Sequence, residues 1–138
     1  MQEKDLKRVT EIERENFSVP WSEEGFRSSL HQNEYLFLTV VAEGEVAGYC
    51  GLLQSFDEAD ITNVAVDKRF RRQGIGYLML TRLMELGRER GIERYTLEVR
   101  AGNEPAIALY EKLGFASVGI RKGFYSMPKE DAVIMWTK

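Results

Sequence analysis

Apolar residues recur at helical spacing in four stretches of the chain. In the first stretch Leu6, Val9 and Ile12 fall three residues apart, which places them on one side of a helix. Ser22 is a suitable N-cap for the second helix, and Asn103 is a suitable N-cap for the fourth. The pattern therefore predicts helices over residues 3–16, 22–31, 74–91 and 103–113.

The third and fourth of these helices have a clear apolar side. Gly91 and Gly114 follow them as natural C-terminal stops, and Pro105 sits in the first turn of the fourth helix, where its missing N–H costs little. The residues expected to face inward are Ile75, Leu78, Met79, Leu83 and Leu86 on the third helix, and Ile107, Tyr110 and Leu113 on the fourth.

Six shorter apolar runs, rich in β-branched and aromatic residues, are typical of strands. They are Leu36–Ala42, Val46–Phe56, Asp60–Val66, Tyr95–Arg100, Phe115–Ile120 and Ala132–Thr137, with turns at Glu43-Gly44, Asp57-Glu58-Ala59 and Met127-Pro128-Lys129. The first three strands should pair antiparallel. The fourth follows a helix, so it should run parallel to the third. We expect one mixed α/β domain over residues 1–138.

Composition excludes several classes of function. The 138 residues are 43% hydrophobic and 30% charged, and the net charge of −3 disfavours a protein that binds nucleic acid by bulk electrostatics. No apolar run reaches the roughly 18–20 residues of a membrane span, and no signal peptide precedes the polar start, so we expect a cytoplasmic protein without membrane contact. A single cysteine, Cys50, and a single histidine, His31, exclude a disulfide, a cysteine zinc cluster and a multi-histidine metal site.

The most informative stretch is residues 63–77, an apolar strand, a basic turn and a helix start punctuated by two glycines. Free N–H groups at a helix N-terminus and the helix dipole make an anion site. The P-loop pattern is absent because Gly76 is followed by Tyr77-Leu78, and a dinucleotide fingerprint needs a third glycine. The turn's cations are not interleaved with an aromatic platform, since Phe70 is the single aromatic residue among them, and this argues against nucleic acid. We expect a phosphate-bearing ligand.

The run Arg71-Arg72-Gln73-Gly74-Ile75-Gly76 resembles the R/Q-x-x-G-x-G/A motif of the GNAT superfamily of N-acetyltransferases. Residues 97–115 further resemble the bacterial ribosomal-protein-alanine N-acetyltransferases, as do shorter segments at 17–22, 120–125 and 130–135, so that the resemblance covers nearly the whole chain. It implies a three-layer fold with about six strands, splayed central parallel strands and about four helices. One departure is visible, because the family usually begins with a strand and this sequence starts almost at a helix.

The resemblance implies acetyl-coenzyme A as co-substrate, with no metal. The matching positions for binding it are Val64, Ala65, Val66, Arg71, Arg72, Gln73, Gly74, Ile75, Gly76, Tyr77 and Asn103. The backbone of residues 64–66 would hold the acetyl and pantetheine groups, and residues 71–77 would hold the pyrophosphate.

Two residues match the family's catalytic positions. Glu98 is the matching general base, and alternation along its strand turns it away from Leu97 and Val99. Tyr110 is the matching general acid for the departing thiolate. The alternatives are a surface carboxylate paired with Arg100 or Arg94 for Glu98, and a packed core aromatic for Tyr110.

Acceptor recognition is less defined in the sequence. Trp21, Tyr125 and the acidic pair Glu130-Asp131 are candidates to shape a peptide cleft, with a packed aromatic and a solvated turn as alternatives. Cys50 lies in an apolar strand without a nearby histidine, which disfavours an acyl-enzyme. The resemblance implies the N-terminal alanine of small-subunit ribosomal protein eighteen as substrate. Another protein terminus, a lysine, a small amine, or a non-catalytic coenzyme A-binding module stay open, and the sequence does not indicate the oligomeric state.

Overall fold

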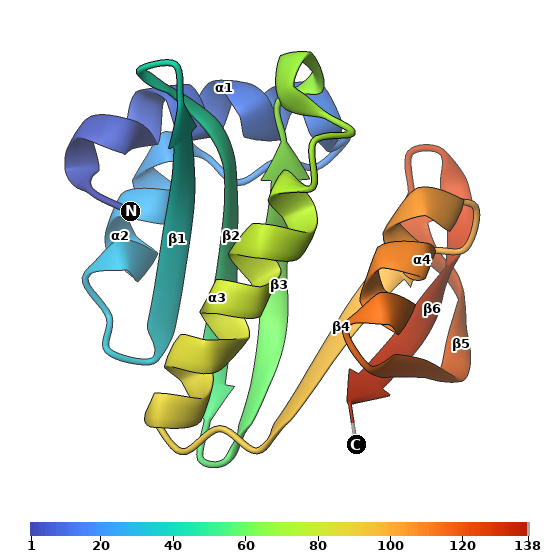
Figure 1. The fold of residues 1–138 in the computed structure, drawn as a ribbon. Coiled ribbons are helices and arrows are strands. Elements are labelled where there is room, and N and C mark those ends of the chain that lie inside the picture. Colours follow the sequence, from blue (N-terminus) through green and yellow to red (C-terminus); the bar gives the residue numbers. More distant parts are fainter. Residues whose placement is uncertain (138) are drawn as a thin grey trace.

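The computed structural model describes residues 1–137, in which helices and strands are arranged in layers (Figure 1). The helices are α1 (Leu6–Asn16), α2 (Glu23–Leu30), α3 (Ile75–Glu89) and α4 (Glu104–Lys112), with short 3-10 turns η1 (Glu3–Asp5) and η2 (Lys68–Phe70). The strands are β1 (Tyr35–Ala42), β2 (Glu45–Ser55), β3 (Glu58–Val66), β4 (Arg94–Arg100), β5 (Phe115–Ser126) and β6 (Lys129–Thr137).

The six strands form one mixed sheet in the order β1-β2-β3-β4-β6-β5. All neighbours are antiparallel except β3 and β4, which run parallel, as the sequence predicts. β1 is an edge strand, and the Met1 amino group donates a hydrogen bond to the carbonyl of Phe37 on it, at 3.2 Å. The predicted mixed sheet with four main helices is therefore confirmed.

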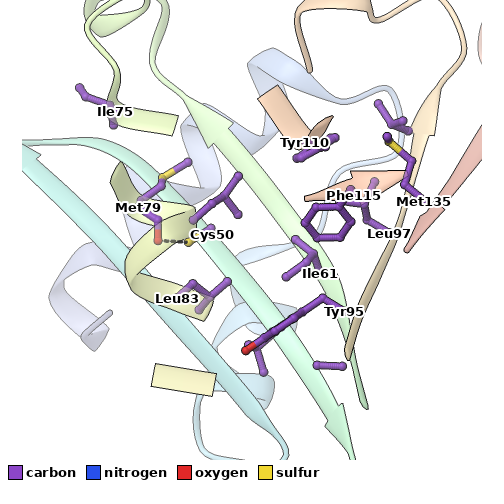
Figure 2. Packing of buried hydrophobic residues seen from close by; sticks show 14 of the residues in the cluster. Cys50, Ile61, Ile75, Met79, Leu83, Tyr95, Leu97, Tyr110, Phe115 and Met135 are labelled. Carbon is purple, nitrogen blue, oxygen red and sulfur yellow. Dashed lines mark hydrogen bonds between the residues drawn. The ribbon is translucent and has the colours of Figure 1, made fainter. Parts of the chain in front are cut away.

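Helices cover the two faces of the sheet, and each face has its own hydrophobic cluster. On one face Leu6, Val9 and Ile12 of α1 and Phe26 of α2 pack against the sheet residues Phe37, Val46, Tyr49 and Ala65. On the other face α3 and α4 cover a larger cluster (Figure 2) that contains Met79, Leu83, Leu97, Val99, Tyr110 and Phe115. The spacing of Leu6, Val9 and Ile12 is the cause of the first arrangement, because residues three apart lie on one side of a helix.

The predicted N-caps of α2 and α4 and the predicted glycines after α3 and α4 are present. The Ser22 side chain accepts a hydrogen bond from the N–H of Gly25, and Asn103 accepts one from Ala106. Gly91 and Gly114 follow α3 and α4 with φ angles of +85° and +95°. Glycine adopts this left-handed conformation without steric cost, so both helices end there.

The bounds of one predicted turn and the predicted burial of one residue of α3 are wrong. The second turn is shorter than expected, because Ser55 pairs directly with Glu58 and leaves Phe56 and Asp57 as the turn. Phe56 takes a left-handed φ of 57°, which a bulky residue rarely adopts and which the sequence therefore does not signal. Leu78 is 62% exposed, because α3 turns the side with Ile75, Met79 and Leu83 inward.

The final hairpin is also longer than predicted. β5 continues past Ile120 to Ser126, and β6 begins at Lys129 instead of Ala132. The register shifts between Arg121 and Tyr125, where Gly123 has a φ of 62°. Polar residues and this irregularity interrupt the alternation by which a strand is recognised in sequence.

A buried carboxylate anchors the loop between α1 and α2. Glu13 of α1 accepts a hydrogen bond from the Tyr49 hydroxyl at 2.6 Å and another from the backbone N–H of Trp21 at 3.0 Å. Both carboxylate oxygens therefore have a partner, which a buried charge requires. Burial and the adjacent Glu13 raise the pKa of Tyr49, so that the hydroxyl stays a proton donor.

The splay between β3 and β4 is the feature that positions the site. The two strands pair only at Glu58–Asp60 with Arg94–Thr96, and beyond these residues they diverge (Figure 1). β3 stays bonded to β2 along its length, and β4 stays bonded to β6. Beyond Asp60, the backbone groups of β3 that face β4 therefore have no strand partner on that side.

Candidate functional site

A cleft of about 800 Å³ opens where β3 and β4 separate. It is lined by both strands, the turn before α3, the first turns of α3 and α4, and the end of α1. The structure brings together at this cleft most of the side chains that the sequence singled out, namely Val64, Ala65, Val66, Arg71, Arg72, Gly74, Ile75, Gly76, Tyr77, Glu98, Asn103, Tyr110 and Tyr125.

Two predicted residues do not line the cleft. Gln73 is exposed on the turn before α3. Trp21 packs instead among Phe26, Tyr35 and Phe37, with ring centroids 5.2 to 6.1 Å away. The packed-aromatic alternative therefore describes the position of Trp21, and its backbone is held by Glu13.

The N-terminus of α3 presents free backbone donors to the cleft. The first helical hydrogen bond runs from Leu78 N to Gly74 O, so the N–H groups of Ile75, Gly76 and Tyr77 have no acceptor within the helix. No acidic side chain lies in this first turn, and the positive end of the helix dipole adds to the donors. The arrangement suits an anion.

The two glycines of this turn serve different purposes. Gly74 has a φ of +77° and open space where a Cβ would point. The left-handed backbone conformation, and not a lack of room, is therefore what favours glycine at this position. A Cβ on Gly76 would lie 3.1 Å from Leu109 Cδ2, so Gly76 lets α4 approach the start of α3. The close approach keeps both helix N-termini at one cleft.

The basic side chains before α3 are held in different ways. Arg71 donates from Nε to the carbonyl of Val66 at 3.2 Å and from Nη2 to Asn16 Oδ1, which links the turn to the end of α1. The buried Asp67 binds the guanidinium of Arg8 and accepts from the N–H of Arg69, which fixes the turn's start. Within residues 1–137, Arg72 has no ion-pair partner.

Glu98 lies on the face of β4 opposite the α3–α4 cluster. Leu97 and Val99 belong to that cluster, and side chains alternate along a strand, so Glu98 points to the side of α1 and α2. Its side chain is 34% exposed, and Arg121 Nε lies 3.8 Å from its Oε2. The suggested partners are engaged elsewhere, since Arg100 pairs with Glu130 and Arg94 with Glu58.

Tyr110 approaches the cleft from α4 on the other side of the sheet. It is 8% exposed, and its ring packs edge-on against Phe115 with centroids 5.9 Å apart. Burial raises the pKa of Tyr110, and the nearby Tyr125 and Cys50 raise it further. Its hydroxyl is therefore protonated throughout the neutral range.

Arg100, at the end of β4, joins the segments around the mouth of the cleft. Its guanidinium donates to Ser18 Oγ at 3.1 Å in the α1–α2 loop, and to the carbonyls of Met127 and Pro128 at 3.1 and 2.9 Å in the β5–β6 turn. It also lies 4.3 Å from the centroid of the Tyr125 ring. Arg100 thereby fixes Tyr125 at the cleft.

The acidic pair Glu130-Asp131 of β6 stabilises the mouth of the cleft through hydrogen bonds. Glu130 accepts from Arg100 at 3.2 Å and from the N–H of Gly102 at 2.6 Å, and Asp131 accepts from the N–H of Gly123 at 2.8 Å.

Burial raises the pKa of Tyr125, and the negative charge of Glu98 raises it further. Tyr125 therefore remains a neutral hydrogen-bonding group beside Glu98.

Several lining residues were not singled out from the sequence as site residues. Among them are Phe17 of the α1–α2 loop, and Thr62 and Asn63 of β3. Thr62 Oγ1 and Asn63 Oδ1 are buried and have no hydrogen-bond partner within the described chain. Two consecutive polar residues, where a strand would otherwise alternate, are the sequence signal that indicates Thr62 and Asn63.

Cys50 does not reach solvent. It is fully buried beneath α3, with its Sγ 3.7 Å from the carbonyl of Met79 (Figure 2). Burial raises the pKa of the Cys50 thiol to about 12. A thiolate nucleophile at this position is therefore disfavoured at neutral pH.

Residues 1–137 contain neither a membrane-spanning helix nor a cluster of metal-ligating side chains. None of their helices has the length and apolar character that crossing a membrane requires. No three or more histidine, cysteine, aspartate or glutamate side chains come together in a way that could hold a metal ion.

The chain is similar in sequence to a known protein family and to named bacterial proteins. A profile of the "Acetyltransferase (GNAT) family" matches residues 6–115. A "Putative [ribosomal protein bS18]-alanine N-acetyltransferase" of Bacillus subtilis is 40% identical over 137 residues, which are 99% of this chain and 91% of that protein. The "[Ribosomal protein bS18]-alanine N-acetyltransferase" of Escherichia coli K12 is 39% identical, over 95% of this chain and 89% of that protein.

A solved structure shows the same architecture. The ribosomal-protein-S18-alanine N-acetyltransferase from Escherichia coli superposes with a TM-score of 0.89 at 37% identity, covering 99% of this chain and 89% of that one. Together with the profile match and the splayed cleft, this similarity shows that the chain belongs to the GNAT family, whose members are N-acetyltransferases that use acetyl-coenzyme A.

Proposed function

We propose that this enzyme acetylates the N-terminal alanine of ribosomal protein bS18 by direct transfer from acetyl-coenzyme A. The observation that carries the proposal is the cleft between β3 and β4, to which Glu98 and Tyr110 contribute from opposite faces of the sheet. Relatives that carry this activity in their names align over 95–99% of the chain. The substrate belongs to the ribosome, and we therefore assign the enzyme to the cytoplasm.

The residues of the cleft fit acetyl-coenzyme A. The first turn of α3 offers free N–H groups for a pyrophosphate, next to the unpaired cation of Arg72. The diverging strands leave backbone donors and acceptors of Val64–Val66 for the amides of the pantetheine arm. Asn103 lines the same cleft, although its Oδ1 caps α4.

Glu98 is proposed as the general base. Acetyl-coenzyme A, when bound, supplies an activated acyl group as a thioester. An α-amino group has a pKa of about 7.7–8.0, so a substantial fraction is already neutral at physiological pH. As the new N–C bond forms, the nitrogen gives one proton to Glu98, whose partly exposed carboxylate then returns it to solvent.

Tyr110 is proposed as the general acid. Its phenol is neutral because burial raises its pKa, and it gives one proton to the sulfur as the C–S bond breaks. The net change is one proton from nitrogen and one proton to sulfur. An unpaired N–H of β3 stabilises the negative charge that develops on the carbonyl oxygen.

Two alternatives have different consequences. The same cleft could serve another protein terminus, a lysine side chain or a small amine, because the chemistry at Glu98 and Tyr110 is the same for each. A coenzyme A-binding module without catalysis would need the α3 site but neither of these two residues. The placement of both at the cleft favours an enzyme.

Gly74→Ala should weaken binding of coenzyme A about tenfold, because the left-handed φ of +77° orients the free N–H groups of α3. Gly91→Ala is a matched control at the other end of α3, with a φ of +85° and equally open surroundings. Each substitution should lower the free energy of unfolding by about 1–2 kcal/mol. Calorimetric titration and denaturant unfolding separate the two effects, and equal affinities for the two variants would contradict the assignment.

Glu98→Gln should retain coenzyme A affinity and lower turnover about a hundredfold at pH 7, because the amide cannot accept the amine proton. The turnover of both enzymes should rise as pH rises through the pKa of the α-amino group, since a larger fraction of acceptor is then neutral. Steady-state rates from pH 6.5 to 9 measure this, with the exposed Glu111→Gln as control. A rate like that of the wild type at pH 7 rules out Glu98 as base.

Tyr110→Phe should lower kcat at least tenfold and change the acetyl-coenzyme A KM less than twofold, because only the proton donor is removed. Tyr95→Phe is the control. The Tyr95 hydroxyl donates a hydrogen bond to the Met84 carbonyl at 2.8 Å, and Tyr95 does not line the cleft. The substitution should cost about 1 kcal/mol of stability and leave kcat unchanged. The raised pKa of Tyr110 also predicts no loss of wild-type kcat between pH 8 and about 10 from its deprotonation. An unchanged kcat for Tyr110→Phe would rule out Tyr110 as the acid and leave it only a packing role.

The decisive experiment is mass spectrometry of peptides incubated with the enzyme and acetyl-coenzyme A. The peptides are an alanine-first peptide from bS18, the same peptide with its N-terminus blocked, and a blocked peptide containing lysine. We expect acetyl transfer to the free alanine terminus alone. Transfer to lysine alone would refute the terminal assignment, and no transfer to any amine would favour the binding module.

A further inference from the structure

Asn63 is a buried amide with an unsatisfied oxygen. The residue is 4% exposed, its Oδ1 has no hydrogen-bond partner within residues 1–137, and it lines the cleft. A buried polar atom without a partner destabilises a fold, so an unpaired acceptor at a cleft indicates a place for a donor from a ligand.

The register of β2 and β3 fixes the direction of this side chain. Asn63 lies opposite Gly51, and a Cβ on Gly51 would meet the ring of Phe37, which belongs to the α1–α2 cluster. Ala65, two residues further along β3, packs in the same cluster. Asn63 therefore points to the α1–α2 face of the sheet.

Glu98 points to this same face from the other splayed strand. Its neighbours Leu97 and Val99 pack under α3 and α4, so the carboxylate faces the opposite way. The cleft therefore has an unpaired amide oxygen on β3 and a carboxylate on β4, both on the α1–α2 face of the sheet. Phe17 lines the same cleft from the α1–α2 loop.

We propose that Asn63 binds the acceptor amine and orients it for attack. This inference rests on the proposed acetyltransferase function. A neutral primary amine has two N–H groups and one lone pair. One N–H directed at Glu98 and the other at Asn63 Oδ1 would leave the lone pair pointing between the strands, where a bound thioester would be held by residues 64–66. Two acceptors on two separated strands thereby determine the orientation of the nitrogen.

Substitutions at Asn63 should move stability and acceptor binding in opposite directions. Asn63→Leu keeps the branched shape of the side chain and removes the unpaired amide, so its Tm should equal or exceed that of the wild type. Its KM for an alanine-first peptide should rise about tenfold, and its acetyl-coenzyme A KM should change less than twofold. Asn63→Ala is a second variant with the same expected KM values.

Asn63→Asp should show the reverse pattern. A carboxylate supplies the acceptor oxygens, so the peptide KM should stay within about threefold of wild type, while the buried charge lowers Tm. Thr81→Val is a matched control, because Thr81 Oγ1 is also buried without a partner but does not line the cleft. It should keep or raise Tm and leave the peptide KM unchanged.

The experiment combines thermal unfolding, steady-state kinetics for both substrates, and calorimetric titration of an alanine-first hexapeptide into the enzyme–coenzyme A complex. The titration reports acceptor binding without turnover. A wild-type peptide KM and affinity in Asn63→Leu, or a change confined to acetyl-coenzyme A, would overturn the inference. A marked drop in Tm for Asn63→Leu would also overturn it, because the amide would then have a stabilising partner.

These outcomes are separate from failure of the proposed substrate. If the wild type does not use the alanine-first peptide but acetylates a lysine or a small amine, the bS18 assignment fails, and the same Asn63 variants are measured with that amine. Loss of affinity for that amine in Asn63→Leu supports the inference, and unchanged affinity overturns it. If the wild type acetylates no amine, both proposals fall.

Discussion

The structure depends on the early end of the hydrogen bonding between β3 and β4. Three residue pairs join the strands, and beyond Asp60 and Thr96 each strand keeps only its outer neighbour. Unpaired backbone groups in the middle of a sheet are unfavourable unless water or a ligand satisfies them. The two halves of the fold hold this separation, because each strand is bonded to a neighbour on its other side and covered by its own helix. The cleft is thus a consequence of the sheet's topology.

The mouth of the cleft is fixed by two charged side chains rather than by apolar packing. Glu13 holds the α1–α2 loop through the N–H of Trp21, and Arg100 holds the same loop through Ser18. Arg100 lies 82 residues from Ser18 in sequence, and it also binds the β5–β6 turn, so it connects two distant segments. Hydrogen bonds to charged groups are stronger than those between neutral groups. The α1–α2 loop and the β5–β6 turn are accordingly held in place at the mouth of the cleft.

Local rules predicted most of the fold from the sequence. Caps at Ser22 and Asn103, the parallel relation of β3 and β4, and the glycine-containing start of α3 all follow from short-range patterns and chain connectivity. Errors arose where tertiary context decides. The turn at Phe56 uses a conformation that its residue type rarely adopts, and the length of the last hairpin depends on an irregular register.

The candidate site was predictable to a similar extent. Motif positions located most of the cleft lining, but contacts between distant segments were not visible in sequence. Trp21 packs into a core cluster, and Glu98 has Arg121 as its charged neighbour instead of Arg100 or Arg94. Asn63 was missed because its significance lies in a missing partner, and only a three-dimensional structure can show that.

The separation of the sheet's two faces also favours direct transfer over an acyl-enzyme. The proposed base, Glu98, is partly exposed on the acceptor side, whereas the proposed acid, Tyr110, is buried under α4 on the other side. Burial raises the pKa of the Tyr110 phenol, which keeps that group a proton donor, while the Glu98 carboxylate stays in contact with solvent. Cys50 lies under α3 with a pKa of about 12, so a covalent route would need a thiolate that the core disfavours. An amine and a thioester that meet between the strands need no such intermediate.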